Sequence, residues 1–81
     1  MLNLQTKTKL PAEDVIVRAK RFFGEGGVGL SLAEEAPGCL TFEGAGGYVT
    51  VTMCVEDDKT RVDLLTQEWE YQVKEFAAKL S

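Results

Sequence analysis

Residues 39–66, CLTFEGAGGYVTVTMCVEDDKTRVDLLT, contain three stretches in which apolar and polar side chains alternate. An alternation with a period of two residues is typical of a β-strand with one buried face. We predict strands over Cys39–Glu43, Tyr48–Glu56 and Arg61–Thr66, because the residues between them favour turns. This part of the chain therefore predicts three consecutive antiparallel strands joined by two hairpins.

The registers of these hairpins can be predicted, because a correct register keeps the apolar side chains on one face of the sheet. The glycine-rich turn before Tyr48 sets the first register, and a turn at Asp58 and Lys59 sets the second. The predicted apolar pairs are Phe42–Val49, Leu40–Val51, Val55–Val62 and Met53–Leu64.

Two further strands and two helices are predicted on either side of this core. Residues 2–8 and Gly27–Glu34 alternate, with Val28, Leu30 and Leu32 on the buried face of the second strand. Residues 11–23 have apolar side chains at helical spacing after Pro11, and Gly24 is expected to end that helix in a left-handed conformation. Residues 67–81 are predicted to form a second amphipathic helix, with Thr66 as its N-cap.

The predicted order is β-α-β-β-β-β-α over one domain, residues 1–81. Each helix has a single apolar stripe and each strand a single apolar face. We therefore expect an α+β fold with two layers, in which an antiparallel five-stranded sheet carries both helices on one face.

This order of elements resembles the fold of the TATA-binding protein and of the helix-grip (START-like, SRPBCC) proteins. The resemblance is carried by LPAEDVIVRAKRFF after the first strand and by VDLLTQEWEYQVKEFAAKL at the end. It implies a final helix that grips the sheet, and in START-like relatives a ligand cavity beneath that helix. The chain is shorter than START-like domains, and the sheet face that would meet DNA in a TATA-binding protein carries Asp63 and Glu43, with Arg61 the only cation among its central strands.

Composition excludes several classes of function. The formal net charge is −4, which disfavours binding to nucleic acid or to an anionic membrane. No apolar run has the roughly 20 residues that a membrane span needs, and the first residues do not resemble a signal peptide. With two cysteines, Cys39 and Cys54, we expect a cytoplasmic protein with free thiols.

Gly24, Gly26 and Gly29 match the G-x-G-x-x-G pattern of phosphate-binding loops. That loop requires a strand before it and a helix after it, so that the phosphate meets the N-terminus of the helix. Here the order is reversed, because the glycines follow a helix and precede a strand. We interpret them as a turn.

No side chains are arranged for a recognisable reaction. The chain has no histidine, so it has no Cys-His couple, and no metal site or cofactor is predicted. The acidic turns at residues 34–35 and 56–58 are interpreted as solvated loops. We therefore expect a protein that is not an enzyme.

Two candidate sites follow from the predicted fold. The seam between helices and sheet is either solid core or a pocket for a small apolar ligand, and its candidate residues are Phe22, Phe42, Met53, Trp69, Val73 and Phe76. The open face of the sheet is a candidate interface for a homodimer, as is a sheet edge; the candidate interface residues are Tyr48, Thr50, Thr52, Cys54 and Leu65. The leading hypothesis is an interaction or assembly module, and the alternative is a carrier of helix-grip type.

Overall fold

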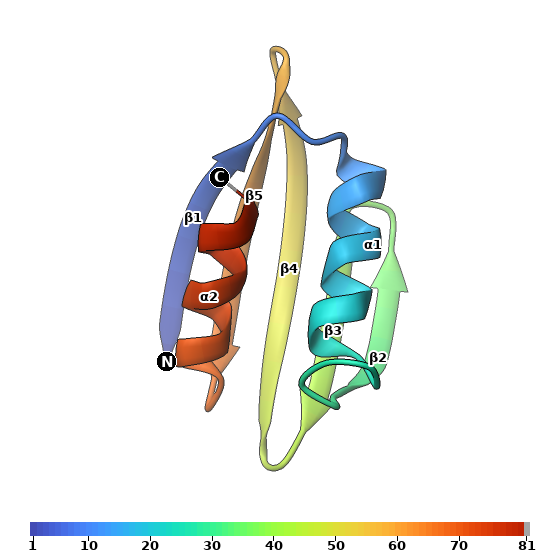
Figure 1. The fold of residues 1–81 in the computed structure, drawn as a ribbon, viewed down its shortest axis with the longest axis vertical. Helices are drawn as coiled ribbons and strands as arrows, with labels where there is room; N and C mark the ends of the chain where they lie inside the picture. The colour runs from blue at the N-terminus through green and yellow to red at the C-terminus, as the bar shows by residue number, and fades with distance from the viewer. Residues whose placement is uncertain (81) are drawn as a thin grey trace.

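The computed structural model describes residues 1–80 as a five-stranded antiparallel sheet with two helices on one of its faces (Figure 1). The strand order across the sheet is β1-β5-β4-β3-β2, so the first strand pairs with the last. This confirms the predicted α+β class and the order β-α-β-β-β-β-α. The elements are β1 (Leu2–Thr8), α1 (Ala12–Phe23), β2 (Ser31–Ala36), β3 (Cys39–Gly44), β4 (Gly47–Glu56), β5 (Lys59–Gln67) and α2 (Glu70–Leu80).

The two helices divide the covered face of the sheet between them. In Figure 1, α2 lies over β1 and β5, whereas α1 lies over β3 beside β4. The β4–β5 hairpin extends beyond both helices at one end of the molecule (Figure 1). The opposite face of the sheet has no second layer in residues 1–80.

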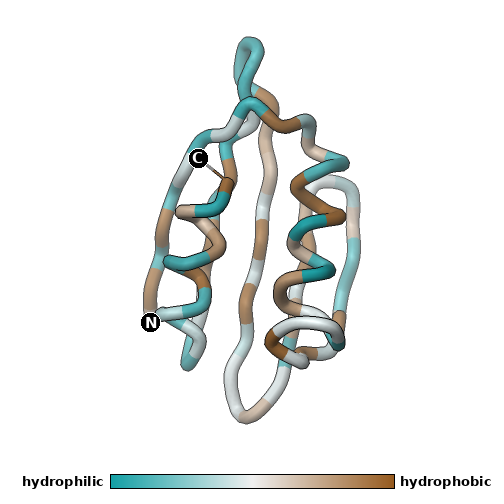
Figure 2. The backbone as a smooth tube through the Cα atoms, in the orientation of Figure 1, coloured by the Kyte–Doolittle hydropathy of each residue, from teal (hydrophilic) through white to brown (hydrophobic). Residues whose placement is uncertain are grey.

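One hydrophobic core fills the space between the layers. Apolar positions alternate along β4 and recur on both helices, as the colours of Figure 2 show. Eight core residues, among them Phe23, Val49 and Leu64, have no exposed surface. The complete core comprises Val15, Ala19, Phe23, Leu30, Leu40, Phe42, Val49, Val51, Met53, Val62, Leu64, Val73, Phe76, Ala77 and Leu80.

The register of the β3–β4 hairpin is the predicted one, with Phe42 opposite Val49. The β4–β5 hairpin differs, because its turn lies at Asp57 and Asp58, where Asp57 has a φ of 56°. Met53 therefore pairs with Val62, and the predicted pairs Val55–Val62 and Met53–Leu64 are wrong. A shift of two residues leaves every side chain on its predicted face. It does move Val55 toward the exposed hairpin tip, where 67% of the residue is accessible.

The segment predicted as a strand from Gly27 to Glu34 is a loop followed by a shorter strand, β2. The loop folds back over the end of α1, whose last carbonyl groups accept hydrogen bonds from it. The Val28 N–H donates to the Phe22 carbonyl and the Leu30 N–H donates to the Phe23 carbonyl, both at 2.8 Å. Strand formation starts only at Ser31, because these N–H groups are already bonded.

Two details of this region correct the sequence interpretation. Gly24 is extended rather than left-handed, with φ −77° and ψ −162°. Leu32 lies opposite Phe42 on the helix side of the sheet, as predicted, yet is 41% exposed because β2 is an edge strand. The pairing of β2 with β3 also shifts at Ala33, where a β-bulge interrupts the ladder.

The second helix begins at Glu70, three residues later than predicted. Thr66 is not its N-cap, because Thr66 lies in β5 between Leu2 and Val49 and is fully buried. Its hydroxyl donates instead to the Tyr48 carbonyl at 2.7 Å. Thr8 and Thr60, the other buried threonines, also donate to backbone carbonyls, those of Leu80 and Leu10.

Candidate functional site

The uncovered face of the sheet carries a strip of uncharged side chains on its central strands. These residues alternate with core residues, which places them on the side away from the helices. Three of them form a cross-strand row, in which Thr50 of β4 lies between Thr41 of β3 and Leu65 of β5. We call this set the open strip; it consists of Cys39, Thr41, Tyr48, Thr50, Thr52, Cys54 and Leu65.

The structure brings all five predicted interface residues into the open strip. Tyr48, Thr50 and Leu65 are half-buried, although no second layer in residues 1–80 covers them, because their neighbours across the strands shield them. Thr52 and Cys54 are exposed. The strip is therefore a surface of mostly small side chains, with Tyr48 at one end opposite the exposed Glu43 of β3.

Charged side chains border the open strip toward the β4–β5 turn. Arg61 contacts two carboxylates, with its Nη1 2.8 Å from Glu56 Oε2 and its Nε 3.3 Å from Asp63 Oδ2. The Lys7 ammonium group lies 3.8 Å from the other oxygen of Glu56. The two cations and two carboxylates of this cluster balance one another in charge.

Both cysteines belong to the open strip, and both are free thiols. Cys39 lies opposite Thr52, and its sulfur is 3.9 Å from the Thr52 hydroxyl oxygen. Cys54 is the next outward residue along β4 and is exposed. The rate at which the Cys54 thiol reacts with a reagent therefore reports whether the strip is accessible to solvent.

The six residues predicted for the seam lie between the helices and the sheet, and most of them are core. Phe42, Val73 and Phe76 are at most 2% exposed, and Met53 is 7% exposed. Phe22 and Trp69 are partly buried against the same core. The Trp69 side chain is anchored by its indole N–H, which donates to the Gly44 carbonyl at 3.3 Å. The side chains of this set pack on one another and on neighbouring core residues.

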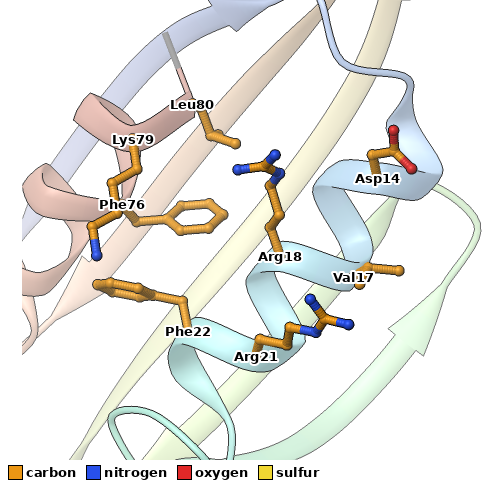
Figure 3. Close-up of a pocket in the computed structure, with 8 residues that line it drawn as sticks. All are labelled: Asp14, Val17, Arg18, Arg21, Phe22, Phe76, Lys79 and Leu80. Carbon is orange, nitrogen blue, oxygen red and sulfur yellow. The ribbon is translucent and has the colours of Figure 1, made fainter.

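A groove runs along the outer side of the helix layer, between α1 and α2 (Figure 3). Its volume is about 680 Å³, within the range of ligand sites in proteins. Of the predicted seam residues, only Phe22 and Phe76 line it. The complete lining is Asp14, Val17, Arg18, Arg21, Phe22, Phe76, Lys79 and Leu80. No pattern in the sequence pointed to this groove, because its two walls are about 60 residues apart in the chain.

Neither face has the residues of a metal centre. Within residues 1–80, no group of three histidine, cysteine, aspartate or glutamate side chains is placed to hold a metal ion. Among the same residues, no helix is long and apolar enough to cross a membrane.

One carboxyl group has a shifted pKa, that of Glu70 at the start of α2. A hydrogen bond from its own backbone N–H lowers the pKa below the ordinary value of 4.5, against an opposing effect of desolvation. The backbone of Glu68 and the Met1 ammonium group, 3.6 Å from the carboxylate, lower it further. Glu70 thus acts at a helix N-terminus, where negative charge is stabilising, and it lies outside both candidate surfaces.

Comparison with known proteins adds no family assignment. No protein-family model matches the chain, and no curated protein is significantly similar to it in sequence.

Proposed function

We propose that this protein is a non-enzymatic interaction module that forms a homodimer through the open strip. One observation carries the proposal: the uncharged strip lies on the only large sheet face that residues 1–80 leave without a covering layer. A sheet can have one solvated face. Here, however, that face concentrates small, uncharged and thiol side chains, including Tyr48 and Leu65, in a chain where 27% of residues are charged.

Charge selects the open strip as the surface through which two copies of this chain could meet. Each chain has a net charge of −4, so two copies repel one another at most orientations. Packing the two open strips together brings their uncharged side chains into contact. A two-fold axis through Thr50 would make such an interface self-complementary, as is usual in homodimers.

The available area is compatible with this interface. The molecule measures 36 × 20 Å along its two longer axes, so the sheet face offers about 700 Å² in plan, close to the roughly 800 Å² per partner of a standard interface. A chain of 81 residues also gains from association, because a small domain buries a modest share of its own surface.

We also propose that the chain is a compact relative of the TATA-binding-protein-like and helix-grip proteins, and that it works in the cytoplasm. The strand order β1-β5-β4-β3-β2 with both helices on one face supports the first proposal. Two free thiols, one of them exposed, support the second, because the cytoplasm keeps thiols reduced. On this proposal the acidic chain binds neither nucleic acid nor membrane through the strip.

Sedimentation equilibrium over a wide concentration range tests the dimer. We expect a monomer–dimer equilibrium for the wild type and a monomer for Thr50→Arg, which places a cation at the centre of the strip. Tyr71→Arg is the matched control, because Tyr71 is 71% exposed on α2, on the opposite side of the sheet. A dimer that survives Thr50→Arg, or a wild type that stays monomeric at millimolar concentration, contradicts the proposal.

The reactivity of Cys54 tests whether the dimer forms through the open strip or through a sheet edge. In a Cys39→Ser variant, Cys54 is the only thiol, and its reaction with a maleimide should slow as the dimer forms. If the dimer forms through an edge strand such as β2, the rate should not depend on protein concentration.

A further inference from the structure

A second surface, on the helix side of the molecule, is positively charged, whereas the rest of the chain is negatively charged. The groove between α1 and α2 continues into a neighbouring hollow of about 530 Å³ beside the end of β1. The two hollows share three lining residues, Arg18, Lys79 and Leu80. We treat them as one groove.

Cations are concentrated around this groove. Six of the nine lysine and arginine residues line it, together with a single carboxylate, that of Asp14. The side chains of the lining therefore carry +5, whereas the other three cations and twelve carboxylates of the chain carry −9. The six cations are Lys7, Lys9, Arg18, Arg21, Lys59 and Lys79.

Most of these cations have no anionic partner among residues 1–80. Lys7 is the exception, through its 3.8 Å contact with Glu56. By contrast, two of the three cations outside the groove, Lys20 and Arg61, form ion pairs of 2.9 and 2.8 Å. The helix dipoles do not explain the clustering, because the N-terminus of α1 and the C-terminus of α2 both lie here and have opposite signs. The positive charge comes from the side chains.

The groove also has an apolar floor. Phe22 and Phe76 meet across the helices with ring centroids 5.4 Å apart, and the Lys79 ammonium lies 5.0 Å from the Phe22 ring centre. In Figure 3, Arg18 extends from α1 toward Leu80, and the two aromatic rings lie below it.

We propose that this groove binds an amphipathic anion, a small molecule with an alkyl body and a carboxylate or phosphate head. The alkyl body lies on Phe22, Phe76 and Leu80, and the head is held by Arg18 and Lys79, which belong to both hollows. A guanidinium group binds either head through two parallel hydrogen bonds. The residues that would contact the ligand belong to α1 and α2, on the side of the sheet away from the open strip.

Calorimetric titration with three probes of equal chain length, all below their micellar concentrations, tests the inference. Decanoate and decyl phosphate should each bind once per chain, and comparing them identifies the preferred head. Decyltrimethylammonium should bind at least about tenfold more weakly, because its charge is repelled by the lining. Inorganic phosphate, which lacks the alkyl body, should also bind more weakly than decyl phosphate.

Variants on the two helices locate the site. Arg18→Gln and Lys79→Gln should each weaken decanoate binding about tenfold, as expected for the loss of a charge-assisted hydrogen bond. Lys74→Gln is the matched control, because Lys74 is an exposed lysine of the same helix outside the groove. Thr50→Arg, on the opposite face, should not change decanoate affinity whatever it does to the dimer.

Three results overturn the inference. The first is an absence of binding by both anionic probes at millimolar concentration. The second is equal affinity for the anionic and cationic probes, which indicates a non-specific apolar patch. The third is an equal effect of Lys79→Gln and Lys74→Gln, which indicates binding governed by overall charge.

Discussion

The hydroxyl group of Thr8 donates a 2.8 Å hydrogen bond to the carbonyl oxygen of Leu80, joining the end of the first strand to the end of the last helix. The Thr8 hydroxyl oxygen in turn accepts a 3.3 Å hydrogen bond from the N–H of Leu10. Carbonyl groups at the end of a helix have no partner within the helix. A single buried side chain, 4% exposed, thus satisfies one of them and holds the turn that leads into α1.

Replacing Thr8 with valine should destabilise the fold, because it keeps the shape of the side chain and removes its hydrogen bonds. The expected loss is about 1–3 kcal/mol of unfolding free energy, since buried polar groups lose their partner. Thr6→Val is the matched control, because Thr6 lies on the same face of β1, is half-buried and is opposite Val62. Chemical denaturation of both variants measures the difference, and an equal effect would show that the Thr8 hydrogen bonds contribute nothing.

Two neighbouring glycines should respond oppositely to alanine. A Cβ atom on Gly27 would overlap the carbonyl oxygens of Phe22 and Arg21 at the end of α1, whereas a Cβ on Gly26 meets no atom within 4 Å. Gly27→Ala should therefore cost more than about 2 kcal/mol, and Gly26→Ala should be neutral or slightly stabilising. Thermal unfolding of the pair checks this, and a stable Gly27→Ala variant would contradict the packing of the loop on the helix.

The register of the β4–β5 hairpin determines which valines of β4 support the core. Val51 is fully buried opposite Leu64, and Val55 is exposed near the turn opposite Thr60. Val51→Ala should reduce the unfolding free energy by about 2 kcal/mol, and Val55→Ala by less than about 0.5 kcal/mol. Similar losses for the two variants would favour the register with the turn at Asp58 and Lys59.

The ionised carboxylate of Glu70 should stabilise the start of α2. Because its pKa is lower in the folded chain than in the unfolded chain, this contribution is complete above the unfolded pKa and is lost as the pH falls through the folded one. A carboxyl NMR titration should show Glu70 titrating below the ordinary value of 4.5. Glu70→Gln should flatten the acid limb of the stability profile; an unchanged limb would show that Glu70 has no role in it.

The sequence predicts the faces of the sheet well, because a side chain's face depends only on whether its position along the strand is odd or even. Thr50 and Thr52 point away from the helices as expected, while Val49 and Val51 are buried. The same property explains the error in the second hairpin. A shift of two residues preserves every face, so alternation alone cannot distinguish a turn at Asp57–Asp58 from one at Asp58–Lys59.

The beginnings of β2 and α2 were less predictable, because tertiary hydrogen bonds determine them. The N–H groups of Val28 and Leu30 bond to the end of α1, which delays the strand. Thr66 has the chemistry of an N-cap, but its ladder with Leu2 and Val49 keeps it in β5. Neither competition is visible in the local sequence.

By itself, the sequence determined the order of the elements, the apolar face of each, and the set of small side chains on the open strip. These properties follow from periods of two and 3.6 residues, which are local. Only the tertiary structure decided that Lys7, Arg18 and Lys79 would surround one groove. Their meeting requires β1 to pair with β5 and both helices to lie on one face, and such contacts between distant segments leave no periodic trace in the chain.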